Sequence, residues 1–122
     1  MERFKLITHK GKTVIRCDLT DFNIYTKEKL QETMDQVKAE IAKHPPGSVL
    51  ILTDLTGVRF DIEIVKKFTD FTRDNKPYIK ASAVLGVAGL MQSAFYSVKR
   101  NALRDIFSFA SEVEALDWLA QQ

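Results

Sequence analysis

The chain has 122 residues, of which 45% are hydrophobic and 28% are charged, and its 18 basic and 16 acidic side chains give a formal net charge of +2. This length supports one hydrophobic core but not two, so we expect a single domain over residues 1–122. Acidic and basic side chains are spread evenly along the sequence. Because no segment is strongly basic, we do not expect a nucleic-acid partner.

The single cysteine and the longest apolar run indicate the cellular compartment in which the protein works. Cys17 has no second cysteine to pair with, and its alternating apolar surroundings predict a buried structural thiol. The N-terminus lacks the apolar region of a signal peptide, and the apolar run over residues 81–91 is too short and too often interrupted to span a bilayer. We expect a cytoplasmic protein without a transmembrane segment.

The first third of the chain has the pattern of a hairpin followed by a helix. Apolar residues alternate over residues 4–8 and 13–17, and Gly11 lies where a tight turn needs a positive φ. Thr26 is placed to cap a helix with apolar residues at spacings of three and four. Those residues are Leu30, Met34, Val37 and Ile41. Residues 44–47, His-Pro-Pro-Gly, end this helix because proline cannot continue its hydrogen bonds.

Strands and helices alternate over the rest of the chain. The expected elements are a strand over residues 48–53 that is buried on both faces, a helix after 61, a strand over 78–87, a helix from about 90, a short strand over 106–109 and a helix over 112–120. Asp61 is predicted to cap the second helix, and Ser111 with Glu114 forms a capping-box pattern for the last one.

The resulting order, β-β-α-β-α-β-α-β-α, predicts the α/β class, with a mixed, largely parallel central sheet and flanking helices. We detect no internal repeat in it. The N-terminal strand is expected at a sheet edge, which leaves pairing with a second copy, a homodimer, open.

No catalytic or metal-binding set stands out. His9 and His44 are far apart in the sequence, and neither has a cysteine at ligand spacing. The sequence has no nucleophile elbow, no P-loop and no dinucleotide-binding fingerprint. We therefore expect no metal, no cofactor and no catalytic residue, and an enzyme that uses Asp54 or Asp61 is the least favoured hypothesis.

The segment between the buried strand and the second helix is the best candidate for a recognition loop. It lies at the carboxyl end of a parallel strand, where α/β proteins usually meet ligands and partners. The predicted partner-binding residues are Asp54, Thr56, Gly57, Arg59, Phe60, Asp61 and Lys66. An ordinary strand-to-helix connection, with one aspartate in the turn and one as the cap, explains these residues equally well.

A second candidate site involves the third helix. Gly86 and Gly89 lie between a strand and that helix, where free N–H groups can receive an anion, although glycines that simply allow close packing are the more economical explanation. An apolar ligand held between this helix and the sheet would contact Met91, Phe95, Tyr96 and Val98, with Lys99 and Arg100 for an acidic head group. Ordinary core packing accounts more simply for the same spacing.

The order of elements and several segments resemble the SpoIIAA-like proteins of the STAS superfamily. The matching segments are residues 49–58, 75–90 and 114–119. The resemblance implies the fold of bacterial anti-anti-sigma factors and of the STAS domains of anion transporters, and the group's name is also linked with lipid-binding SEC14 domains. It implies a non-enzymatic regulatory module that binds a protein partner. The alternative is a small carrier or sensor of a lipid or other apolar ligand.

One position departs from the anti-anti-sigma pattern. In those proteins a serine at the start of the helix is phosphorylated to release the partner, whereas the matching pair here is Asp61-Ile62. Isoleucine has no oxygen to modify, so we expect no phosphoswitch at this position. The nearest hydroxyl, on Thr56, is predicted to belong to the loop structure.

Overall fold

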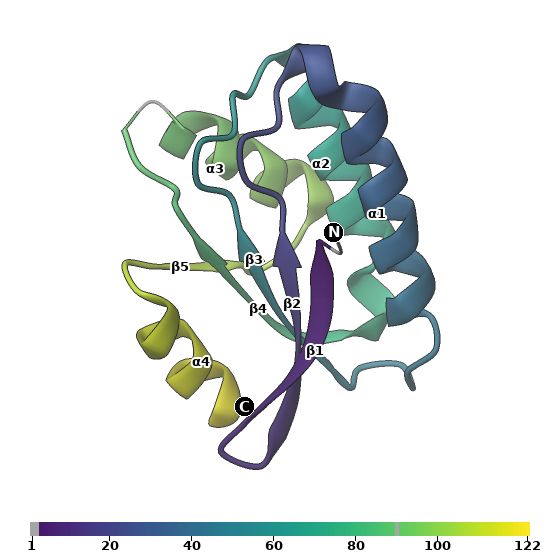
Figure 1. Ribbon diagram of the computed structural model, residues 1–122, viewed down its shortest axis with the longest axis vertical. Helices are drawn as coiled ribbons and strands as arrows, with labels where there is room; N and C mark the ends of the chain where they lie inside the picture. The colour runs from purple at the N-terminus through teal and green to yellow at the C-terminus, as the bar shows by residue number, and fades with distance from the viewer. Residues whose placement is uncertain (1–2, 90) are drawn as a thin grey trace.

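The computed structural model describes residues 3–89 and 91–122 and shows a five-stranded sheet with four α-helices (Figure 1). The strands are β1 (Phe4–His9), β2 (Lys12–Asp18), β3 (Val49–Asp54), β4 (Ile79–Leu85) and β5 (Phe107–Phe109). The helices are α1 (Lys27–Ile41), α2 (Ile62–Asp74), α3 (Met91–Ala102) and α4 (Glu112–Ala120), with short 3-10 turns η1 (Ile24–Thr26) and η2 (Lys76–Tyr78). The predicted class and element order are confirmed.

The strands lie side by side in chain order, β1-β2-β3-β4-β5. β1 is antiparallel to β2, and every other neighbouring pair is parallel. Lys10 and Gly11 at the hairpin turn both have positive φ, 51° and 80°, as a two-residue type I′ turn requires. Because β1 is the first strand in this order, it is an edge strand, as predicted.

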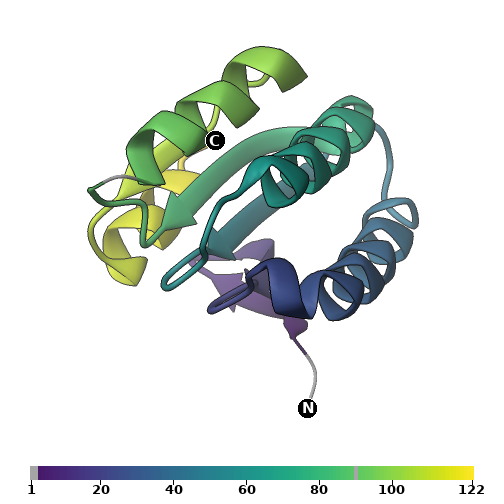
Figure 2. The same cartoon turned by 90° about the horizontal axis from the view of Figure 1, so that it is seen from above.

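Helices cover both faces of the sheet. α1, α2 and α3 pack on one face, and α4 lies on the face away from α1 and α2 (Figure 2). β3 serves both layers, because Val49 and Ile51 belong to the core under α1–α3 while Leu50 and Leu52 belong to the core under α4. Burial of this strand on both faces is confirmed. None of the described helices is long and apolar enough to cross a membrane.

Polar side chains fix where the helices begin. Asp61 Oδ1 accepts from Ile64 N–H at 2.8 Å, so the predicted cap of α2 is confirmed. Ser111 caps α4 by accepting from Glu114 N–H at 3.2 Å. Thr26 is the N-cap residue of α1, as predicted, but its side chain makes no capping bond to that helix. Its hydroxyl instead accepts from Asn23 N–H at 3.0 Å and closes the turn η1, from which α1 continues.

Cys17 is fully buried in the core under α1–α3, which confirms the prediction of a structural thiol. Burial raises the pKa of this thiol to about 12. The thiolate form, which is the reactive one, is therefore scarce at neutral pH.

Candidate functional site

β2 and β3 each end at the aspartate of an Asp-Leu-Thr motif, which occupies positions 18–20 and 54–56. The two aspartates are partners in the strand register. Thr20 donates its O–H and N–H to Asp18 Oδ1 at 2.6 and 3.0 Å, and Thr56 donates to Asp54 Oδ1 at 2.7 and 3.0 Å. The two motifs therefore have the same local geometry.

The helices that follow these motifs pack against each other. Three polar contacts join α1 to α2, and each joins residues 36 positions apart, the same separation as between Asp18 and Asp54. They are Lys27–Glu63 at 2.9 Å, Gln31–Lys67 at 2.9 Å and Lys38–Asp74 at 3.2 Å. β2 with α1 and β3 with α2 are therefore two neighbouring strand–loop–helix units that share the Asp-Leu-Thr motif. The buried faces of the two helices do not correspond at this separation, because the buried Leu30 of α1 lies opposite the exposed Lys66 of α2 in the alignment.

The predicted partner-binding residues divide into exposed and packed side chains. Thr56, Gly57 and Arg59 are exposed in the loop, and Lys66 is exposed on α2 beside the α1–α2 groove. Asp54 and Asp61 are partly buried, and each accepts hydrogen bonds that shape the loop or cap the helix. Phe60 turns inward, where its ring lies 5.3 Å from that of Phe68.

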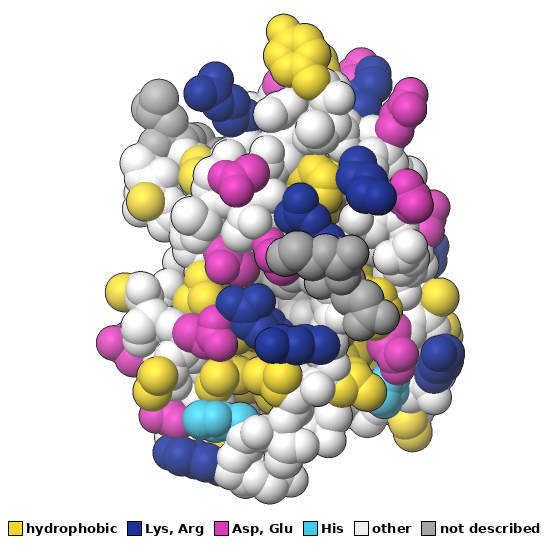
Figure 3. Space-filling view, in the orientation of Figure 1, with side chains coloured by type: hydrophobic (Ala, Val, Ile, Leu, Met, Phe, Trp, Pro, Cys, Tyr) yellow, Lys and Arg dark blue, Asp and Glu magenta, His cyan; other side chains and the backbone are white. Residues whose placement is uncertain are grey.

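Two exposed apolar side chains lie in the segments that flank these loops. Ile62 is 90% exposed at the start of α2, and Tyr25 is 94% exposed in η1. Arg59 N–H donates to Phe22 O at 2.9 Å, so the loops after β2 and β3 run side by side (Figure 1). In the space-filling view, hydrophobic atoms project at this end of the molecule, and basic and acidic groups interleave below (Figure 3). Sequence analysis did not select Ile62 or Tyr25 for this surface.

The two glycines before α3 differ in their surroundings. A Cβ on Gly86 would lie 2.5 Å from Thr56 N and 2.6 Å from Thr56 Cα, and Gly86 has a φ of +82°. A Cβ on Gly89 would meet nothing within 4 Å. Gly86 is therefore required for contact between the β4–α3 and β3–α2 loops. Near the start of α3, Met91 N–H and Gln92 N–H donate to Ala88 O and Gly89 O.

Charged side chains on the α4 side of the sheet form a structural network. Arg16 Nη2 lies 2.6 Å from Glu112 Oε1 and 3.9 Å from Asp54 Oδ2, and the hydrogen bond to Glu112 raises the pKa of Arg16. Burial by itself raises the pKa of Asp18, but the Thr20 hydrogen bonds together with nearby arginines outweigh it and lower that pKa. Asp18 and Asp54 thus belong to paired, hydrogen-bonded groups rather than to a poised catalytic base.

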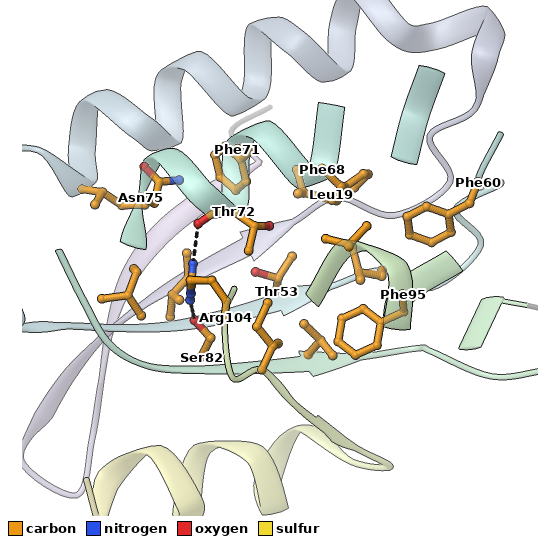
Figure 4. Close-up of a pocket in the computed structure, with 17 residues that line it drawn as sticks. Leu19, Thr53, Phe60, Phe68, Phe71, Thr72, Asn75, Ser82, Phe95 and Arg104 are labelled. Atoms are coloured by element: carbon orange, nitrogen blue, oxygen red, sulfur yellow. Dashed lines mark hydrogen bonds between the residues drawn. The ribbon is translucent and has the colours of Figure 1, made fainter. Parts of the chain in front are cut away.

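A cavity of about 50 Å³ lies behind the recognition loop, between the sheet and helices α2 and α3 (Figure 4). Of the side chains predicted to hold an apolar ligand, Phe95 and Val98 line it. Tyr96, Lys99 and Arg100 instead border a shallow hollow on the outer side of α3, and Met91 packs against the edge of the core. The predicted set is therefore not gathered around one cavity.

Arg104, in the connection between α3 and β5, is partly buried and lines both this cavity and the hollow outside α3, and it was not among the predicted site residues. Its Nη1 donates to Thr72 O at 2.9 Å, and its Nη2 donates to Ser82 Oγ. Burial lowers the pKa of Arg104 to about 10. Within residues 3–89 and 91–122, no carboxylate lies within 4.0 Å of its guanidinium. A lone arginine outside a periodic segment gives no sequence signal of this placement.

The sheet order, the antiparallel edge strand and the helices on both faces define the STAS fold, as the sequence resemblance implied. A solved structure with this fold is that of an anti-sigma factor antagonist from Mycobacterium paratuberculosis, with a TM-score of 0.58 and 15% sequence identity over 95% of this chain and 92% of that one. No protein-family model matches the sequence, and no curated protein does. At this identity the likeness establishes the fold.

Proposed function

We propose that this chain is a regulatory module that acts by binding another protein rather than by catalysis. The proposed surface consists of Tyr25, Arg59 and Ile62, at the end of the sheet where β2 and β3 finish. The observation that carries the proposal is the exposure of Ile62 and Tyr25, 90% and 94%, in the segments that flank the loops, one of which holds the exposed Arg59. Tyrosine and arginine are enriched among the residues that contribute most to protein interfaces.

The hydrogen bonding of the acidic groups supports a binding role over catalysis. Asp54 accepts two bonds from Thr56, and Asp61 caps α2. A general base needs a free lone pair directed at a substrate and a pKa near the working pH. Both carboxylates instead have structural roles that account for their positions. The free buried thiol of Cys17 fits a reducing compartment, so we propose that the protein works in the cytoplasm.

We further propose that binding is not controlled by phosphorylation at the start of α2. Ile62 follows the capping aspartate and has no hydroxyl. The hydroxyl of Thr56 donates to Asp54 at 2.7 Å, so its modification would disrupt the loop. If phosphate is found on Thr56 in protein from the native host, this part of the proposal is wrong.

The test compares a variant of the proposed surface with a control variant on α4, each of which replaces an exposed apolar side chain by serine. A partner is first captured by cross-linking in the host and purified, and its affinity is then measured by calorimetry. Arg59→Glu with Ile62→Ser is expected to weaken binding at least tenfold, because it removes an apolar anchor and reverses a charge. Val113→Ser, which alters a 65% exposed apolar residue on α4, serves as the control. Equal affinity of the double variant and wild type would refute the surface.

A second candidate function, a carrier or sensor of a small apolar ligand, is favoured by the cavity behind β3. It draws on Phe95 and the other apolar lining residues rather than on the outer side of α3. Native mass spectrometry of protein purified gently from its host tests it, because a bound molecule appears as extra mass that organic solvent removes. The same spectrum gives the subunit number and so tests pairing of two copies through the edge strand β1.

A further inference from the structure

We infer that the cavity between β3, β4, α2 and α3 binds a small monocarboxylate, with the carboxylate at Arg104 and the hydrocarbon part against the phenylalanines. This inference goes beyond protein binding and is independent of the surface of Tyr25, Arg59 and Ile62. It rests on an arginine without a counter-charge and on polar side chains without partners in one part of the cavity, and on apolar side chains in the other part.

The charge of Arg104 has no counter-charge among the described residues. Its guanidinium donates only to neutral oxygens, the carbonyl of Thr72 and the hydroxyl of Ser82. Those bonds use two of its five N–H donors. Arginines that are removed from water are normally paired with an anion, because an unpaired charge in apolar surroundings is costly. An anionic ligand would supply the missing charge.

Two more polar side chains lack partners at the same end of the cavity. Asn75 is 3% exposed, and its side-chain amide makes no hydrogen bond to a described residue. The hydroxyl of Thr53 is likewise without a partner in the described part of the chain. Both residues line the cavity that Arg104 enters.

The opposite end of the cavity is apolar. Figure 4 shows Arg104 bonded to Thr72 and Ser82, and the rings of Phe60 and Phe95 lying further along, beyond Thr53. Leu19 and Phe68 also line this part. The site thus has one charged end and one hydrocarbon end, the arrangement that recognises a carboxylate carrying a short alkyl tail.

Volume and charge narrow the ligand class. One water needs about 10–15 Å³ of this kind of space, so a cavity of about 50 Å³ takes only a short acid. Arg104 is the only cation among the residues that line it. A dicarboxylate would bury a second negative charge without a partner, so the site should reject it.

The first experiment compares ligands on the unaltered protein. Acetate and propionate are titrated by calorimetry beside acetamide, propionamide and succinate, and the methyl resonances of the protein are followed by NMR. We expect monocarboxylates to bind at least tenfold more tightly than their amides and succinate not to bind. Shifts should appear at Val98 and Ile106, which line the cavity, and not at Val113 on α4. Equal affinity for acid and amide, no binding of either, or shifts confined to Val113 would overturn the inference.

The second experiment removes the charge and keeps the side-chain length. Arg104→Met should weaken carboxylate binding at least tenfold and leave amide binding unchanged. Thr53→Val, which keeps the shape and removes one hydroxyl, should weaken it several-fold and serves if the first variant does not fold. If Arg104 only closes the carboxyl end of α2, Arg104→Met lowers stability while wild type binds no carboxylate, and the inference fails. Arg59→Glu with Ile62→Ser must bind carboxylate like wild type, which separates this result from that of the protein-binding test.

Discussion

The two strand–loop–helix units, β2 with α1 and β3 with α2, share the Asp-Leu-Thr motif and differ in the residues around it. In the first unit Phe22, two residues after the motif, is 2% exposed, and Cys17, directly before the motif, is fully buried. In the second unit the corresponding positions are Val58, which is buried, and Thr53, which opens onto the cavity. The shared motif sets the geometry, and the neighbouring residues determine whether a unit only supports the fold or also forms a site.

The motif itself is structural in both units. Leu19 and Leu55 are buried in the core, and their N–H groups donate to the end of the next strand, to Asp54 O at 3.0 Å and to Leu85 O at 2.9 Å. The aspartate before each leucine accepts from the threonine after it. Each strand therefore leaves the sheet in the same way, and the two aspartates need no catalytic explanation.

The largest predicted difference between the units is in thiol reactivity at the register pair Cys17 and Thr53. Wild-type Cys17 should react with a small alkylating reagent at pH 8 at least about a thousandfold more slowly than a free thiol, because its pKa is about 12 and its side chain is fully buried. In the variant Cys17→Ala with Thr53→Cys, the thiol faces the cavity and should react at least about a hundredfold faster than Cys17. Mass spectrometry of timed samples measures both rates, and equal rates would mean that the cavity is closed to small molecules.

The next largest effect is expected at Gly86, which lies against Thr56 in the loop of the second unit. Gly86→Ala should lower the free energy of unfolding by about 3 kcal/mol, because the new methyl group meets the backbone of Thr56 and the residue keeps a positive φ. Gly47→Ala is the matched control, since Gly47 has a φ of +70° and open space around it, and it should cost about 1 kcal/mol. Urea unfolding measures both. A similar loss in the two variants would show that φ alone, and not the approach to Thr56, limits position 86.

Sequence patterns were sufficient for the fold and for part of the candidate site. The apolar periodicity of α1 and the unbroken apolar run of β3 report burial directly, and Asp61 was recognisable as a cap from its place before α2. The inward direction of Phe60 was not predictable, because a loop residue has no period that fixes its side chain. Arg104 and Asn75 meet in one cavity only through the packing of α2, α3 and the sheet, which no local pattern records.

The threonines of the two motifs should differ in a smaller way. Thr20→Val should cost about 2 kcal/mol at pH 7, because Thr20 is partly buried and its hydroxyl donates to a carboxylate, and Thr56→Val about 1 kcal/mol, because Thr56 is exposed. The lowered pKa of Asp18 stabilises the fold above the ordinary aspartate pKa of about 3.9, and that stability is lost as pH falls through the folded pKa. The gap between wild type and Thr20→Val should therefore narrow from pH 5 to pH 2. A gap that is constant in urea titrations across this range would contradict the role of Thr20 in holding Asp18 ionised.

The smallest effect on stability is expected at Ile62. Thr26, which lies 36 residues earlier at the start of α1, provides the comparison. Thr26→Ala removes the oxygen that accepts from Asn23 N–H and should cost about 0.5–1 kcal/mol. Ile62→Ser should change the free energy of unfolding by less than about 0.5 kcal/mol, since a side chain that is 90% exposed has little burial to lose. Thermal unfolding of both variants measures the difference. If Ile62→Ser costs as much as Thr26→Ala, Ile62 has a structural role in the isolated chain. If it costs nothing, the isolated fold does not require Ile62, as expected of a side chain that acts in partner binding.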